Sequence, residues 1–172
     1  MFSNATGVLD PAPWPREGAP EVATVPTPVI EIRHGKTGRL LHKVAAESLS
    51  DCELQGLDLR GADLREARLE RANLEGADLR GAVLTDADLV GARLKGARLQ
   101  RSDLEGAELG NADLRDANLA GAQLSYARMS AADLRGANLR GANLTKVTMR
   151  HIRYDTRTRW PWFFDVESAT RR

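Results

Sequence analysis

The sequence predicts an all-β solenoid, in which short extended segments wind into stacked coils. Three observations predict it: a five-residue period that runs from Leu54 to Met149 without insertion or deletion, an apolar residue at the centre of every unit, and a small residue two positions earlier. With the centre called i, the 20 units carry Leu 18 times and Met twice at i, and Ala 16 times at i−2. Two of the five columns are therefore apolar.

The period itself favours this class. Five residues fit neither the ~3.6 of an α-helix nor the ~2 of a long strand, and a short fixed repeat is typical of solenoids. Positions i−2 and i are two residues apart, so an extended segment points both side chains to one side and i−1 to the other. Ten units carry Gly at i+2, where a repeated corner needs unusual backbone angles. Each unit is therefore predicted to be a very short strand followed by a turn.

The unit Ala-(Asp/Asn)-Leu-x-x, as in residues 62–64 and 142–144, resembles the repeat of the pentapeptide repeat proteins. The resemblance implies a right-handed, quadrilateral β-helix with four units per coil. It also implies that i points inward at the centre of each face, with i−2 inward beside it. Twenty units would then make about five coils, and a rod roughly 24 Å long at the ~4.8 Å spacing of neighbouring strands.

The regions outside the repeat have a different composition. Residues 1–28 contain six of the seven prolines and no apolar period, which predicts a disordered Pro-rich arm. Residues 29–46 contain two apolar runs around a Gly-containing turn, a pattern typical of a β-hairpin. We expect this hairpin to be a cap that seals the first coil. The β-helix is predicted over residues 47–153, followed by a C-terminal cap and tail over 154–172.

Five of the eight aromatic residues lie in the C-terminal segment, where the column of small residues stops. They are Tyr154, Trp160, Trp162, Phe163 and Phe164. Two roles are open for them: a plug for the end of the core, or the contact of a homodimer. The family resemblance implies that both can hold, because many members pair end to end through the C-terminus. Beyond Phe164 the chain is polar, and we expect it to be frayed.

With four units in each coil, the outward residues can be sorted by face. The face centred on Leu59 has a net charge of +3, the next face, centred on Leu64, has −3, and the other two are nearly neutral. The arginines of the first, the basic face, are Arg60, Arg80, Arg98, Arg101 and Arg140. The acids of the second, the acidic wall, are Asp63, Glu66, Asp86, Asp103 and Glu105, with Asp88 as a neighbour.

The acidic wall is the candidate docking site for a protein partner. Its acids surround Val83 within the first three coils, and the alternative is a solvated face that keeps the rod soluble. Tyr126 is the one aromatic residue on the outside of the predicted rod and lies at a corner near Arg128. It is a second candidate contact, or a corner filler.

The sequence predicts no catalytic residue, cofactor or metal site. The three histidines, His34, His42 and His151, lie in or near the end pieces without metal-ligand spacing. Cys52 falls on the inward i−2 column, which indicates a small buried thiol and not a nucleophile. Asp and Asn at i−1 are interpreted as solvated or turn-bonding residues. No run of the ~20 apolar residues that cross a bilayer is present, so we expect a cytoplasmic protein without membrane contact.

These observations favour a non-catalytic, rigid scaffold or protein-interaction module with an unknown partner. The alternative implied by the resemblance is a DNA-mimicking binder of type II topoisomerase (DNA gyrase) that protects it from quinolones or natural toxins. A duplex would carry roughly 14 negative charges along ~24 Å, whereas residues 51–150 hold 16 acids against 15 bases. DNA mimicry is therefore ranked below the interaction module. Direct nucleic acid binding is disfavoured, because acids intersperse the basic face and no aromatic platform accompanies it.

Overall fold

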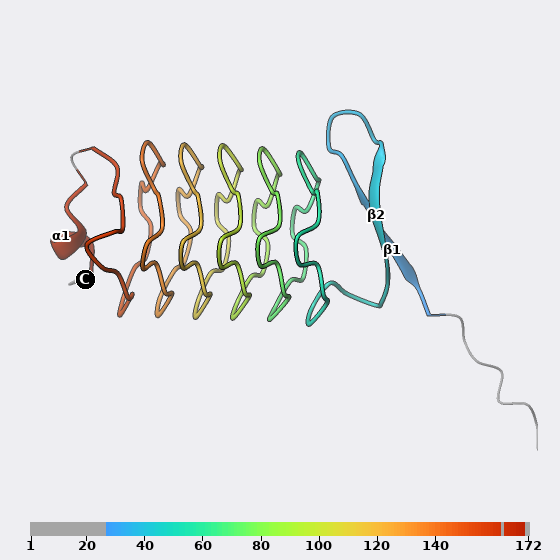
Figure 1. Cartoon of the computed structure of the whole chain (residues 1–172), viewed down its shortest axis with the longest axis horizontal. Helices are drawn as coiled ribbons and strands as arrows, with labels where there is room; N and C mark the ends of the chain where they lie inside the picture. The colour runs from blue at the N-terminus through green and yellow to red at the C-terminus, as the bar shows by residue number, and fades with distance from the viewer. Residues whose placement is uncertain (1–26, 163, 171–172) are drawn as a thin grey trace, which may run out of the picture.

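The computed structural model describes residues 27–162 and 164–170. It is a rod of stacked coils, with a β-hairpin at one end and a short helix at the other (Figure 1). The hairpin consists of β1, Val29–Arg33, and β2, Leu40–Ala45, and the helix α1 is Val166–Thr170. The arm predicted for residues 1–28 falls almost entirely outside the described residues, as does Phe163.

Each face of the rod is held by a ladder of parallel backbone pairs that is one residue wide. The residue at i−1 pairs with the residue 20 positions later, as Glu53 does with Asn73 and Asp58 with Asp78. Twenty residues make four units, so each coil contributes one rung to each of four ladders. The four-sided shape follows from this offset.

In a middle unit with Asp or Asn at i−1, every backbone N–H finds an acceptor, as in residues 72–76. The N–H groups of Asn73, Leu74 and Gly76 donate to carbonyls of neighbouring coils at 2.9, 2.8 and 2.9 Å. That of Ala72 donates within the turn at 3.0 Å, and that of Glu75 donates to Oδ1 of Asn73 at 3.2 Å. All eleven Asp or Asn residues at i−1 accept the N–H of i+1 in this way. The turn-bonding interpretation of these residues is confirmed.

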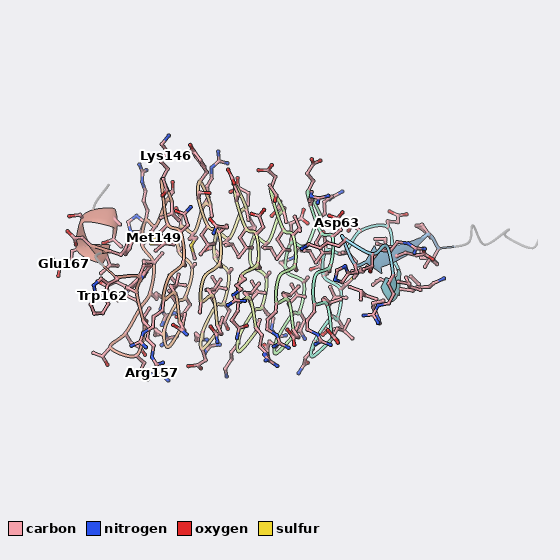
Figure 2. All side chains as sticks on the ribbon, turned by 90° about the horizontal axis from the view of Figure 1, so that it is seen from above. Asp63, Lys146, Met149, Arg157, Trp162 and Glu167 are labelled. Carbon is pink, nitrogen blue, oxygen red and sulfur yellow. The ribbon has the colours of Figure 1, made fainter. Side chains whose placement is uncertain are left out.

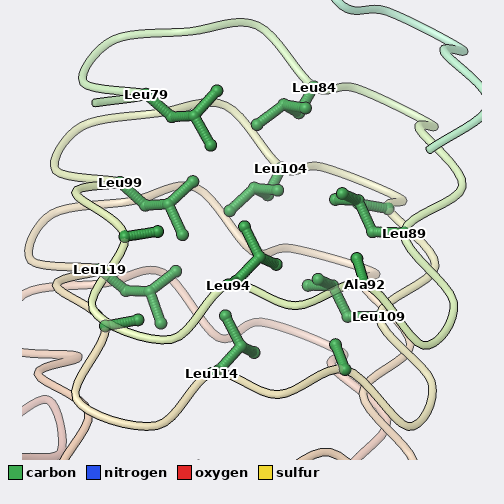
Figure 3. Close-up of a cluster of buried hydrophobic side chains, with 14 of the residues drawn as sticks. Leu79, Leu84, Leu89, Ala92, Leu94, Leu99, Leu104, Leu109, Leu114 and Leu119 are labelled. Carbon is green, nitrogen blue, oxygen red and sulfur yellow. The ribbon is translucent and has the colours of Figure 1, made fainter. Parts of the chain in front are cut away.

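The interior is filled by the two predicted apolar columns. Leu79, Leu99 and Leu119 stack one above another along one face, each at most 1% exposed (Figure 3). Ser102 replaces one Ala of the i−2 column and is fully buried, and its hydroxyl donates to the carbonyl of Leu99 at 2.8 Å. The substitution is tolerated because the buried hydroxyl is paired.

Every corner of the repeat has a positive φ, whether or not the residue is Gly. Ten of the 20 corners carry other residues, among them Glu66 at 55°, Tyr126 at 62° and Ala131 at 61°. The left-handed conformation costs an L-residue roughly 1–2 kcal/mol. The ladders therefore impose the corner even where the sequence disfavours it.

At the N-terminal end the hairpin joins the first coil. The N–H of Asp63 donates to the carbonyl of Arg33, and that of Gly35 to the carbonyl of Gly61, both at 2.8 Å. Ile32, only 2% exposed, belongs to the core. Gly61 is needed here for two reasons: its φ is 63°, and a Cβ would lie 2.5 Å from Nε2 of His34. The hairpin thus lies against the open face of the first coil.

At the C-terminal end the ladder continues with one extra residue. Asp133 pairs with Arg153 in the regular register, but Asn138 pairs with Arg159, 21 positions later. Thr158 is buried and its hydroxyl donates to the carbonyl of Leu134 at 2.9 Å. Tyr154, which the repeat phase would place inward, is 42% exposed, and its ring packs against Trp160.

Residues 165–170 are not frayed as the sequence suggested, because α1 forms there. The carboxylate of Asp165 accepts hydrogen bonds from the backbone N–H of Ser168, at 3.1 Å, and from its hydroxyl, at 2.6 Å. A carboxylate bonded to the N–H three residues later is the usual N-terminal cap of a helix. The polar residues Asp165 and Ser168 therefore form the N-terminal cap of α1.

Candidate functional site

The structure brings the residues of the acidic wall together. Asp63, Val83 and Asp103 are consecutive rungs of one ladder, so Val83 lies between two carboxylates. Glu66 and Asp86 follow each other along the adjoining corner, at φ values of 55° and 56°. Glu105 and Asp88 complete the set, and Asp88 belongs to the ladder of the next face, between Arg68 and Glu108. Figure 2 shows Asp63 near the hairpin end of the rod.

The acids of this wall differ from the other acids in their pairing. Within residues 27–162 and 164–170, Asp63 alone of the six forms an ion pair, with Arg65 at 2.9 Å. On the basic face, in contrast, Asp78 contacts Arg80 at 2.6 Å and Arg98 at 3.5 Å. The uncompensated negative charge of the rod is therefore concentrated on this wall.

The basic face is neutralised near the hairpin and charged near α1. Two hydrogen bonds from Arg60 to Asp58, at 2.8 and 2.7 Å, lower the pKa of that carboxyl to about 2. The side chain of Arg80 likewise lowers the pKa of Asp78. No outward residue of this face from Arg98 onward is acidic. The positive charge of the face therefore belongs to its C-terminal half.

The predicted aromatic group is divided by the structure. Trp160 contacts Tyr154 edge to face, with centroids 5.7 Å apart, and stacks on Phe164 at 5.5 Å. These rings pack at the end of the core, where Trp160 and Phe164 are half-buried. Trp162 is 87% exposed at the C-terminal end of the rod (Figure 2). Three of the five predicted residues thus form one cluster, Trp162 projects from it, and Phe163 lies outside the described residues.

The second candidate contact, Tyr126, has a different neighbour from the one expected. Its ring is half-exposed, and Nζ of Lys146 lies 4.9 Å from the ring centroid and 3.1 Å from the hydroxyl. Arg128, the expected neighbour, pairs with Glu108 instead. The sequence alone did not indicate Lys146 as the neighbour of Tyr126; the 20-residue offset between adjacent coils is the signal that could have found it.

The remaining reactive side chains have structural roles. Cys52 is half-buried, its thiol donates to the carbonyl of Ser48 at 3.4 Å, and burial raises its pKa. A raised pKa disfavours the thiolate that nucleophilic chemistry needs. No group of three His, Cys, Asp or Glu residues in the described part of the chain could hold a metal ion. The same part contains no helix with the length and apolar character of a membrane span.

Comparison with known proteins identifies the family. The pentapeptide repeats model matches residues 48–86, 77–116 and 112–150, with eight copies. The chain belongs to the pentapeptide repeat family. Proteins of this family are right-handed quadrilateral β-helices, and they are generally structural or interaction modules and not enzymes. No curated protein matches the chain.

Several solved structures are similar to it. A pentapeptide repeat protein (Rfr23) from the cyanobacterium Cyanothece 51142 is 40% identical, with a TM-score of 0.54 over 55% of this chain and 64% of that one. The chain therefore spans less than two thirds of the length of Rfr23. The protein alr5209 from Nostoc Pcc 7120 is 40% identical over 62% and 80% of the two chains, with a TM-score of 0.36. QnrB1, a plasmid-mediated fluoroquinolone resistance protein, is 18% identical over 69% and 76%, with a TM-score of 0.32.

Proposed function

We propose that this protein is a rigid, non-catalytic interaction module whose acidic wall docks a partner with a basic surface. The observation that carries the proposal is the set of wall carboxylates without an ion pair within the described residues, whereas most acids of the other faces are paired. Rigidity follows from ladders that occupy nearly every backbone donor of the repeat. A preorganised charged surface favours fast association and selects partners of opposite charge.

The two ends fit this role as seals of a finite rod of about five coils. The hairpin places Ile32 in the core, and the cluster of Tyr154, Trp160 and Phe164 covers the opposite end. Sealed ends keep a solenoid from stacking on other chains through unpaired backbone and apolar surface. The free thiol of Cys52 fits a cytoplasmic protein in a reducing compartment.

A homodimer through the C-terminal end is part of the same proposal. Its support is the exposed indole of Trp162, which the aromatic cluster leaves uncovered. In a two-fold dimer the same patch meets its own copy, so one substitution acts twice. Trp162→Glu should therefore convert a dimer into a monomer in light scattering without loss of the β circular dichroism. A wild-type protein that runs as a monomer at tens of micromolar would exclude the dimer.

The docking proposal is tested by neutralising the wall. The variant Glu66→Gln, Asp86→Asn, Asp103→Asn and Glu105→Gln removes four charges and keeps the turn bond at position 103. The matched control Glu53→Gln, Glu70→Gln, Glu75→Gln and Glu108→Gln has the same net charge but leaves the wall intact. Proteins captured from cytosol should be retained by the control and lost with the wall variant. Equal capture by both would contradict the proposal.

The same uncompensated acids support the second candidate, a DNA-mimicking gyrase binder. A wall of net charge −3 is short for a duplex mimic, which is why this function remains second. A supercoiling assay with and without a quinolone decides the matter. Protection of gyrase that the wall variant lacks and the control retains would replace the first proposal with this one.

A further inference from the structure

We propose that the C-terminal end of the basic face binds a nucleoside phosphate, with the phosphate between Arg140 and Arg159 and the base on Trp162. Two grooves meet there. One, of about 600 Å³, is lined by Arg140, Arg159, Trp160 and Trp162. The other, of about 670 Å³, is lined by both arginines, by Asn118 and Asn138, and by the ion pair of Asp116 and Arg157. The two guanidinium groups therefore lie between an aromatic groove and an amide groove.

The anion subsite follows from charge. Arg140 and Arg159 are both exposed, and neither has an ion-pair partner within residues 27–162 and 164–170. Asp116 and Asp155, the acids of this region, are both engaged by Arg157, at 3.3 and 3.0 Å. Two uncompensated guanidinium groups beside each other repel, and an anion relieves that repulsion. The planar guanidinium fork matches the geometry of phosphate.

The base subsite follows from the aromatic residues. Trp162 is 87% exposed and lines the groove. Large aromatic side chains are usually well buried, so an exposed indole at a groove is a candidate binding surface. Trp160 in the same groove is fixed by its ring contacts with Tyr154 and Phe164. Any of the planar nucleobases can stack on such an aromatic surface. Arg157 and Trp162 lie at the same end of the rod (Figure 2).

The amide groove supplies further hydrogen-bond donors on the side of the guanidinium groups away from Trp162. Nδ2 of Asn138 donates to Oδ1 of Asn118 at 3.3 Å, and Oδ1 of Asn138 accepts the N–H of Arg140 at 3.2 Å. An amide has two N–H donors and two acceptor sites, so each side chain keeps unused capacity toward the groove. In a nucleoside phosphate the sugar lies between the base and the phosphate, so these amides, on the other side of the guanidinium groups from Trp162, can donate further hydrogen bonds to the phosphate oxygens.

The extra residue in the last coil creates this arrangement. The pair between Asn138 and Arg159 spans 21 residues, which places Arg159 on the ladder of Asn138 and next to Arg140 in the following coil. The regular spacing of 20 would have placed Thr158 there. The repeat phase alone therefore predicts a basic face without an aromatic platform, whereas the folded chain supplies one at its C-terminal end.

Isothermal titration of the full chain with AMP, adenosine, inorganic phosphate and a 5′-phosphorylated oligothymidylate tests the proposal. AMP should bind at least tenfold more tightly than adenosine or inorganic phosphate, because only AMP fills both the cationic and the aromatic subsites. Arg140→Gln with Arg159→Gln, and separately Trp162→Ala, should each weaken AMP binding at least tenfold. Lys95→Gln and Tyr126→Ala, which alter an exposed cation and an exposed aromatic elsewhere, should leave it unchanged.

The oligonucleotide separates the two sources of the ligand. Binding tighter than that of AMP, and weakened by Arg101→Gln, identifies the end of a single strand, whereas equal binding identifies a free nucleotide. Absence of AMP binding, inorganic phosphate binding as tightly as AMP, or insensitivity to the three substitutions would each overturn the proposal. The wall variant should bind AMP normally, so the two proposals fail independently. If the dimer through Trp162 exists, AMP should shift it toward monomer, because both occupy the same indole.

Discussion

The middle coils and the two ends of the rod use the same backbone ladder but complete it with different groups. In the middle, the repeat supplies every partner, and Leu94 and Ala97 are fully buried by their own copies above and below. At the ends, non-repeating groups replace the missing coil: the carbonyl of Arg33 at one end and Oδ1 of Asp155, which accepts the N–H of Gly136 at 2.9 Å, at the other. The repeat thus specifies a rod, and the non-repeating ends specify its length.

The largest effect should come from the middle of the core. Leu94→Asn places an amide in a fully buried column and should destabilise the rod by at least about 4 kcal/mol, from the lost apolar burial and the unpaired polar group. Arg93→Asn places the same side chain at an outward i−1 position, where Asn is the residue of the repeat, and should change stability by less than about 1 kcal/mol. Thermal melting followed by circular dichroism compares them, and equal melting temperatures would refute the division into inside and outside.

Removal of an end should damage the rod through association. Deletion of residues 27–45 removes Ile32 and the carbonyl of Arg33, which exposes the first coil and should cause aggregation at micromolar concentration. Deletion of residues 1–24 is the control and should leave the melting temperature nearly unchanged. Light scattering during a slow thermal scan measures both. A soluble, monomeric chain without residues 27–45 would show that the hairpin is dispensable.

Acid should loosen the C-terminal end. Burial alone would raise the pKa of Asp155, but the N–H of Gly136 and the contacts of Arg157 outweigh it and lower the pKa from 3.8 to about 2. Because the folded value is the lower one, the contribution of Asp155 is present above about 3.8 and is lost as the pH falls through about 2. Asp155→Ala should lower the melting temperature at neutral pH, whereas Asp155→Asn keeps an acceptor and should lower it less. Identical melting of both variants would contradict this role.

The features that repeat every five residues could be predicted from the sequence. The buried Leu and Ala columns, the corners and the turn-bonding Asp and Asn residues all follow from a spacing of five. Contacts between coils need the offset of 20, which came from the family resemblance; Lys146 over Tyr126 is such a contact. The placement of Arg159 beside Arg140 depends on one extra residue after Tyr154. A periodic pattern cannot predict at which position of the last coil such an extra residue is accommodated.

The smallest effect, and the finest test of the comparison, concerns the corners. Ala131 has a φ of 61°, so Ala131→Gly should remove its left-handed penalty of roughly 1–2 kcal/mol, partly offset by the ~0.5–1 kcal/mol of extra chain entropy that Gly loses on folding. A net gain of about 0.5–1 kcal/mol is expected.

Gly141→Ala is the reverse experiment, because Gly141 has a φ of 69° and no atom within 4 Å of an added Cβ. It should cost a similar amount through backbone strain alone. Opposite shifts of similar size in urea denaturation would show that the ladders, and not the corner residues, set the path of the chain. A loss of stability in Ala131→Gly would show instead that chain entropy dominates at the corners.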